Sequence, residues 1–260
     1  MGQMESMMEL LKQMDIQKEM EKQSIVTDSK LFKCEECKDN GWIYPGLNEK
    51  GVRCNCAYQY MQKQKNDKIK QLFSEAYVNY TFDNFEIEDD YQKTMKTKAQ
   101  SFITNKGIDS ILLLGQSGCG KTHLAVSIAK ELLDKGAWIE MLPYPEFIRT
   151  VKAYAMDPDN YNDLMSKYRN CNYLIIDDFL KTTIKGKTVN TTDLDYVMRL
   201  IDHRYTHKKP VIVTSEYMMD VIIEADEAIA GRLREMAGSY IVQIKKDKGR
   251  NYRTRGLMEV

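Results

Sequence analysis

The feature that most constrains this chain is a glycine-rich segment, Gly115-Gln116-Ser117-Gly118-Cys119-Gly120-Lys121-Thr122. It follows an apolar run at residues 110–114 and precedes a helical pattern at residues 121–135. The pattern G-x-x-x-x-G-K-[ST] between a strand and a helix is typical of a loop that holds phosphates on backbone N–H groups at a helix N-terminus. The segment therefore predicts a nucleoside triphosphate site in an α/β fold.

The residues of this segment are expected to have different roles. Lys121 is expected to reach the β and γ phosphates, and the Thr122 hydroxyl is expected to ligate Mg²⁺. The predicted nucleotide-binding set is Gly115, Gln116, Ser117, Gly118, Cys119, Gly120, Lys121, Thr122, the adjacent His123 and, from a later strand, Ser215. The spacing of His123, His203 and His207 gives none of these histidines a partner.

Strand-like and helical patterns alternate beyond residue 78. The predicted strands are residues 110–114, 138–142, 173–177, 210–215 and 240–244, and the predicted helices between and after them are 121–135, 145–154, 192–205 and 226–236. Strands separated by helical crossovers form a parallel sheet that helices cover on both faces. We therefore expect a three-layer α/β domain over residues 78–260, preceded by a smaller unit over residues 1–77.

The strand at residues 173–177 ends in two acids, Asp177 and Asp178. A parallel sheet delivers such residues to its carboxyl edge, where a phosphate-binding loop also lies. Asp177 is expected to hold the metal together with Thr122, and Asp178 is expected to orient the attacking water as a base. The alternative is that the two acids lie in a solvated turn or cap a helix. Neither alternative explains well why the acid pair directly follows an aliphatic run.

Four cysteines near the N-terminus form two close pairs, Cys34 with Cys37 and Cys54 with Cys56. The surrounding residues 30–58 contain few aliphatic side chains, so this segment needs a bound metal ion or a covalent cross-link in order to fold. Four thiolates suffice for a tetrahedral Zn²⁺ site, and an all-cysteine site is structural rather than catalytic. A disulfide framework, an iron–sulfur cluster and unligated thiols are the alternatives.

Charge and hydropathy limit the partners of the chain. Its 38 basic and 38 acidic residues balance, so any nucleic-acid surface must be local. Residues 245–255 are basic and include Tyr252, which suits single-stranded DNA, although a solvated tail explains them equally well. Lys181, Lys185 and Lys187 are a second basic candidate. Neither group contains a base-reading motif, so we expect no sequence specificity.

The N-terminal residues 4–20 carry a stripe of methionines that predicts a short amphipathic helix. Such a helix either packs on the next module or docks on a partner, a role that the flexible methionine side chain suits. No apolar stretch approaches the roughly 18 residues of a membrane span, and no leader pattern begins the chain. We therefore expect a cytoplasmic protein.

The phosphate-loop motif, the Asp177-Asp178 strand end, the strand at residues 210–216 and Ala230-Gly231-Arg232-Leu233 resemble the AAA+ ATPases. Within these, the chain resembles the DnaC/DnaI-type replicative helicase loaders, particularly phage versions, and the related IstB-like transposition helpers. The resemblance covers residues 78–250 by layout. It implies an arginine finger at Arg232, which would reach the ATP of a neighbouring subunit, with Arg234 as the competitor.

The residues Asp39-Asn40-Gly41-Trp42 after the second cysteine resemble the zinc module of the DnaI-like loaders, which the transposition helpers generally lack. The resemblance thus implies an ATPase that uses ATP, Mg²⁺ and Zn²⁺, forms homo-oligomers and loads the hexameric replicative helicase onto single-stranded DNA. The alternatives are a transposition helper and a non-hydrolysing ATP-sensing adaptor.

The chain departs from the family pattern at two positions, and its lack of room for a lid domain fits the loader family. Glu216 stands where the family often has Asn, which weakens terminal-phosphate sensing there, and Asp178 replaces the usual Glu, which predicts slow hydrolysis. The sequence after the last predicted strand is too short for the helical lid domain that many AAA+ proteins carry.

Overall fold

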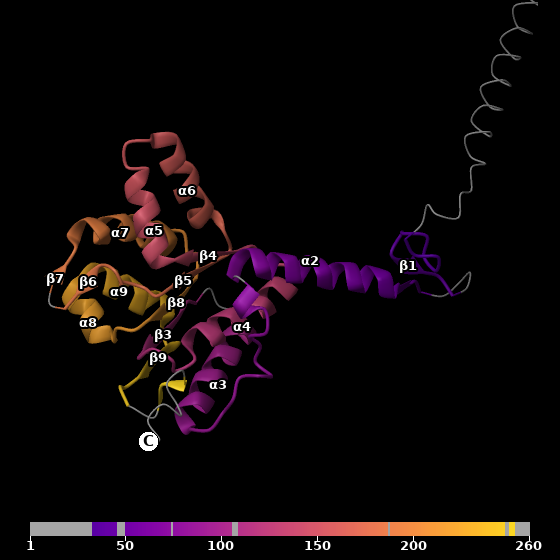
Figure 1. The fold of residues 1–260 in the computed structure, drawn as a ribbon, viewed down its shortest axis with the longest axis horizontal. Helices are drawn as coiled ribbons and strands as arrows, with labels where there is room; N and C mark the ends of the chain where they lie inside the picture. Colours follow the sequence, from indigo (N-terminus) through magenta and orange to yellow (C-terminus); the bar gives the residue numbers. More distant parts are fainter. Residues whose placement is uncertain are drawn as a thin grey trace, which may run out of the picture. The chain divides into compact units, whose positions relative to one another are not determined.

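The computed structural model describes residues 33–45, 50–73, 75–105, 109–186, 188–247 and 250–252 (Figure 1). The chain forms two compact units, Met1–Gln64 and Lys65–Val260, which divide earlier than the predicted boundary near residue 78. The helix expected at residues 4–20 lies outside the described residues. In the described part of the chain, no helix is both long enough and apolar enough to cross a membrane.

The first unit is built around turns rather than an apolar core. Strands β1 (Trp42–Ile43) and β2 (Val52–Arg53) pair antiparallel, and helix α2 (Asn55–Phe73) follows directly. Two tight turns carry the chain into this hairpin, with Lys38 N donating to the Cys34 carbonyl at 3.0 Å and Asn40 N donating to the Cys37 carbonyl at 3.1 Å. Across the hairpin, Cys54 N donates to the Gly41 carbonyl at 2.9 Å. These turns bring the two cysteine pairs of the sequence to one place.

The second unit contains the predicted parallel sheet. Its strands are β3 (Ile111–Gly115), β4 (Ile139–Pro143), β5 (Tyr173–Asp177), β8 (Val211–Ser215) and β9 (Ile241–Ile244), and their order is β4-β5-β8-β3-β9. Every pairing in this sheet is parallel. Because β5, β8 and β3 are neighbours, their carboxyl ends meet at one edge, and the predicted functional residues follow these ends.

Helices cover both faces of the sheet, as predicted. Helices α3 (Asp90–Thr104) and α4 (Lys121–Asp134), with the end of α2, pack on one face; α5 (Tyr144–Ala153), α6 (Pro158–Asn170), α7 (Thr191–Thr206), α8 (Met219–Ala225) and α9 (Glu227–Ala237) pack on the other (Figure 1). Alternate residues of β3 separate accordingly, since Ile111 and Leu113 join the first core and Leu112 and Leu114 join the second. The three-layer α/β expectation is confirmed.

Several short elements were not predicted from the sequence. They are the hairpin of β1 with β2, helices α6 and α8, the 3-10 turn Glu75–Tyr77, and the hairpin of β6 (Ile184–Lys185) with β7 (Thr188–Val189). Helix α6 is mostly polar and buries only Met165 and Tyr168, so its apolar period is weak. Its start signal is nevertheless present, because Asp157 caps the helix by accepting a hydrogen bond from Asn160 N and Pro158 follows it.

The side chain of Arg204, on α7, is fully buried at the edge of the sheet opposite the phosphate loop. Its guanidinium donates to the carbonyls of Tyr168 and Pro210, each at 2.7 Å, and to that of Cys171 at 3.3 Å. Burial lowers the pKa of Arg204. This side chain therefore ties α7 to the end of α6 and to the start of β8 through backbone oxygens.

Candidate nucleotide site and zinc centre

The glycine-rich loop has the backbone conformation that phosphate binding needs. Gly118 and Gly120 have φ of 76° and 94°, in the left-handed region that favours glycine. A Cβ on Gly120 would lie 2.7 Å from the ring of Phe85, so a side chain does not fit there. Gly120 also caps α4, whose first-turn N–H groups are directed toward the loop. The cradle thus fits a phosphate at a helix N-terminus.

The amino group of Lys121 lies inside this loop. The side chain is buried, and its Nζ donates to the carbonyls of Gly115 and Gln116, both at 2.7 Å. Burial lowers the pKa of Lys121, because a desolvated ammonium lacks the stabilisation that water gives. A phosphate group would supply the missing negative charge, so the lysine is suited to an anionic ligand.

The predicted metal ligands lie together, Thr122 at the start of α4 and Asp177 at the end of β5. The Thr122 hydroxyl donates to Asp177 Oδ1 at 3.1 Å, and the Thr214 hydroxyl donates to the same oxygen at 2.5 Å. Burial raises the pKa of Asp177 against the lowering effect of the Thr214 hydrogen bond. The Thr122 hydroxyl and the Asp177 carboxylate are adjacent oxygen donors, and Mg²⁺ prefers oxygen ligands of this kind.

Asp178 follows with a left-handed backbone, at φ 56°, and its N–H donates to Thr214 Oγ1 at 3.1 Å. Its carboxylate faces the pocket but is engaged by Lys181, whose Nζ lies 2.8 Å from Asp178 Oδ2. The same Nζ lies 3.6 Å from Glu216 Oε1, which comes from the end of β8. The sequence offered Lys181 as a DNA contact, whereas the structure has it lining the nucleotide pocket.

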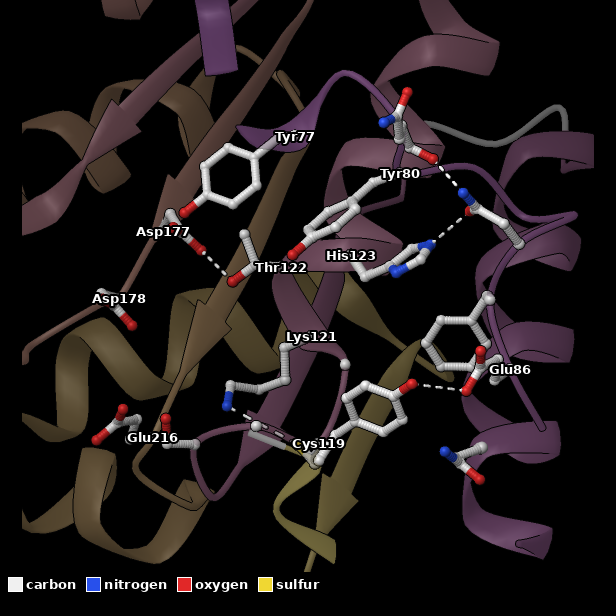
Figure 2. Close-up of a pocket in the computed structure, with 18 of the residues that line it drawn as sticks. Tyr77, Tyr80, Glu86, Cys119, Lys121, Thr122, His123, Asp177, Asp178 and Glu216 are labelled. Carbon is white, nitrogen blue, oxygen red and sulfur yellow. Dashed lines mark hydrogen bonds between the residues drawn. The ribbon is translucent and has the colours of Figure 1, made fainter. Parts of the chain in front are cut away.

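The pocket has a volume of about 440 Å³ and two unlike sides. Figure 2 shows Asp177, Asp178 and Glu216 along one side, Lys121 and Thr122 in the middle, and Tyr80, His123 and Glu86 on the other. Further lining residues are Tyr77, Asn79, Asn84, Phe85, Gln92, the loop residues Ser117, Gly118, Cys119 and Gly120, Lys181 and Tyr252. An acidic end thus faces an end with aromatic side chains.

His123 belongs to the aromatic side. Its ring stacks on Tyr80 with centroids 4.3 Å apart and meets the edge of Phe85 at 5.1 Å. Nε2 lies 2.8 Å from the Thr81 carbonyl, so this nitrogen is the donor. Burial lowers the pKa of His123. Its partners come from a segment about forty residues earlier, which explains why spacing along the sequence revealed none of them.

Ser215 is fully buried at the end of β8. Its hydroxyl donates to the Phe179 carbonyl at 2.8 Å and accepts a hydrogen bond from Tyr217 N at 3.2 Å. Within the described part of the chain, Ser215 is not among the residues that line the pocket, whereas the next residue, Glu216, is. The sequence did not single out Thr214, although a polar side chain inside an apolar strand was a signal for it.

Arg232 lies on α9, away from the described residues that line the pocket of its own chain. Its Nε and Nη2 lie 2.9 Å from Asp202 Oδ1, and the guanidinium lies 5.8 Å from the ring centroid of Tyr205. Arg234, on the same helix, is exposed. An arginine finger at either position would therefore serve a neighbouring copy.

The described part of the predicted basic tail lies against the phosphate loop. The Gln116 side chain exchanges two hydrogen bonds with the backbone of Asp247, at 2.8 and 2.6 Å. Tyr252 N donates to the Gly118 carbonyl at 3.1 Å, and the Tyr252 hydroxyl donates to Glu86 at 2.8 Å. Of the other basic candidates, Lys185 is exposed on β6, and Lys187 lies outside the described residues.

The two cysteine pairs meet in the first unit. The Sγ atoms of Cys34, Cys37, Cys54 and Cys56 all lie within 4.8 Å of one another, and the closest pairs are 3.2 and 3.6 Å apart. A tetrahedral site with Zn–S bonds of about 2.3 Å spaces its sulfurs about 3.8 Å apart. The described cysteines form no disulfide. The donor set and its spacing fit a structural zinc ion.

The sequence of this chain matches a known protein family. Residues 49–255 match the model of the family described as IstB-like ATP binding protein. The chain belongs to this family. IstB-like proteins thus share with this chain the region that contains the loop, the acid pair and the sheet. The resemblance to AAA+ proteins of the DnaC/DnaI type is confirmed.

The relatives of this IstB-like protein include phage-related proteins. It is 31% identical over 185 residues to the uncharacterized protein YqaM of Bacillus subtilis. The aligned region covers 71% of this chain and 53% of YqaM. This chain therefore matches about half the length of that relative. It is 27% identical over 228 residues to the phage-like element PBSX protein XkdC of the same organism, covering 84% and 85%. The replicative helicase loader DnaC of Escherichia coli is 24% identical over 176 residues, covering 64% and 70%.

Solved structures share the fold of this IstB-like protein. The crystal structure of the DnaC helicase loader aligns with a TM-score of 0.57 at 21% identity, covering 66% of this chain and 99% of that chain. The crystal structure of DnaI aligns with a TM-score of 0.54 at 20% identity, covering 68% and 93%. At these identities the likeness establishes the architecture alone.

Proposed function

We propose that this IstB-like protein is an ATPase that loads a hexameric replicative helicase onto single-stranded DNA. The observation that carries the ATPase part is the meeting of Lys121, Thr122, Asp177 and Asp178 around one pocket. The observation that carries the loader part is the four-cysteine cluster in front of a domain with the DnaC and DnaI fold. The loader part of the proposal rests on the resemblance of the cysteine region to the zinc module of the DnaI-like loaders.

In the proposed reaction, a water oxygen attacks the γ-phosphorus of ATP while the bond from that phosphorus to the β–γ bridging oxygen breaks, and ADP leaves. The backbone N–H groups of the loop and Lys121 would bind the phosphate oxygens, and Thr122 with Asp177 would hold Mg²⁺. An Asp178 oxygen orients the attacking water and accepts its proton. Arg232 of a neighbouring copy stabilises the charge that develops on the transferred phosphoryl group, which makes hydrolysis depend on assembly.

The first unit is the proposed contact for the helicase. Three apolar side chains of its hairpin region are exposed to solvent, with exposed fractions of 41% for Trp42, 67% for Tyr44 and 58% for Val52. A small unit that exposes aromatic side chains in this number is suited to binding another protein. The structural zinc would keep the hairpin that presents them in shape.

The test is a loading assay with the replicative helicase of the same biological system, circular single-stranded DNA, ATP and Mg²⁺. We expect a complex of protein and helicase, helicase bound to the circle, and loss of loading in Lys121→Ala. Trp42→Ala/Tyr44→Ala should lose the complex with the helicase while it retains ATP binding. The loader proposal is wrong if no complex forms and the helicase loads equally well without this protein.

A transposition helper is the second candidate, and the IstB-like family description favours it. That function requires binding to duplex DNA and regulation of a transposase rather than a complex with a helicase. The ATP-sensing adaptor is a third candidate, which the Lys181 ion pair on Asp178 favours, because an engaged carboxylate is a poor base. DNA-stimulated ATP turnover separates the adaptor from both enzymes.

A further inference from the structure

The acidic end of the pocket has more negative than positive charge. Three carboxylates line it, those of Asp177, Asp178 and Glu216, and two lysines face them, Lys121 and Lys181. A nucleoside triphosphate brings further negative charge to the same place. Two of the acids, Asp178 and Glu216, would repel its terminal phosphate unless a cation stood between them and the phosphate.

Lys181 is in the position to be that cation. Its Nζ lies 2.8 Å from Asp178 Oδ2 and 3.6 Å from Glu216 Oε1, so it bridges the ends of two neighbouring strands, β5 and β8. The hydrogen bond with Asp178 raises the pKa of Lys181, which keeps the ammonium charged. Lys121 comes from a different element, the start of α4, and its Nζ donates to carbonyls of the phosphate loop.

The loop that carries Lys181 has a packed backbone, and the side chain of Lys181 is partly exposed. Phe179 and Leu180 are buried in the core, and Lys181 N donates to the Asp178 carbonyl at 3.1 Å. Asp178 and Leu180 have left-handed φ values of 56° and 65°, which non-glycine residues rarely adopt. The Lys181 side chain, in contrast, is 46% exposed, so its ammonium can move without moving the loop.

We infer that Lys181 is a second cation of the nucleotide pocket, which binds the terminal phosphate and sets the preference for a triphosphate over a diphosphate. This inference rests on the proposed ATPase function and adds a residue to it. One ammonium cannot serve a phosphate and the Asp178 carboxylate equally well. When Lys181 turns toward the terminal phosphate, Asp178 is released to orient water, so recognition of the triphosphate and the availability of the base are linked.

The experiment compares equilibrium binding of ADP and of a non-hydrolysable ATP analogue, both with Mg²⁺. For Lys181→Ala we expect about a tenfold loss of affinity for the analogue and less than about a twofold change for ADP. Lys181→Arg should keep most of the preference, because it keeps the charge. Lys185→Ala, which removes an exposed lysine of the same connection between β5 and α7, should change neither affinity.

A second variant tests the charge argument itself. Lys181→Ala/Glu216→Gln removes one of the two repelling carboxylates together with the cation, so it should recover part of the lost analogue affinity. The inference is overturned if Lys181→Ala weakens ADP and the analogue equally, or if the double variant recovers nothing. Failure of the ATPase proposal has a different signature, because the wild-type protein would then bind neither nucleotide, or would bind ATP without hydrolysing it.

Turnover gives an independent readout of the link to Asp178. Lys181→Ala should raise KM for ATP while kcat falls less than in Asp178→Asn, since the base remains present in the first variant. An unchanged KM in Lys181→Ala would contradict contact with the terminal phosphate.

Discussion

The hydroxyl of Thr122 donates a hydrogen bond to Asp177 Oδ1 over 3.1 Å, which joins the start of α4 to the end of β5. Thr122→Val keeps the shape of this side chain and removes the oxygen that is proposed to bind the metal. We expect ATP affinity with Mg²⁺ to fall at least about tenfold, and affinity measured in EDTA to stay unchanged. Titration of each variant in both buffers checks this, and equal losses in the two buffers would contradict a metal role.

Asp177→Asn should make the nucleotide-free protein more stable. Burial raises the pKa of Asp177, so the folded protein binds a proton there more readily than the unfolded chain does. Stability therefore falls as the pH rises from the unfolded pKa through the raised folded value, and the cost is fully present above that value. In EDTA at neutral pH the variant should have a higher Tm than the wild type, with a smaller difference at acid pH. A lower Tm would contradict this.

Arg232 is expected to act on the ATP of a neighbouring copy. Arg232→Ala and Lys121→Ala should each lack DNA-stimulated ATPase activity, and mixing them should restore up to about a quarter of the wild-type rate, since a random mixture joins an intact pocket to an intact arginine in that share of contacts. Arg234→Ala is the matched control and should remain active. An active Arg232→Ala, or a mixture without activity, would exclude the trans role.

The cysteine cluster is expected to hold one zinc ion per chain, measurable by metal analysis of the purified protein. Cys34→Ser/Cys54→Ser should lose the metal and the folded structure of the first unit, because an all-cysteine zinc site supplies the folding free energy of a unit without a core. ATP binding should remain, since the residues of the pocket belong to the second unit. An iron–sulfur absorption band, or protein without metal, would contradict the zinc assignment.

Arg204→Met should lower the free energy of unfolding by about 3 kcal/mol, because the buried carbonyls of Tyr168, Cys171 and Pro210 lose a charged donor. Denaturant titration measures this change. Nucleotide affinity should be unaffected in the folded variant, since Arg204 lies at the opposite edge of the sheet. Wild-type stability in Arg204→Met would show that water replaces the guanidinium without cost.

The sequence by itself determined the framework of the protein. Apolar runs of strand length alternate with helical periods, which is sufficient for a parallel sheet with helices on both faces. The segment from Gly115 to Thr122 and the acid pair Asp177-Asp178 are local patterns whose chemistry follows from their residue types. The two cysteine pairs predicted the cluster because zinc ligation depends on short, recognisable spacings.

Only the tertiary structure decided which side chains complete the pocket. Lys181 reaches Glu216 because β5 and β8 are neighbours, and His123 stacks on Tyr80 because a segment about forty residues away returns to α4. The register of β5 on β8 likewise sets the hydroxyl of Thr214 against Asp177. These contacts join distant parts of the chain through packing and strand order, which no local spacing encodes.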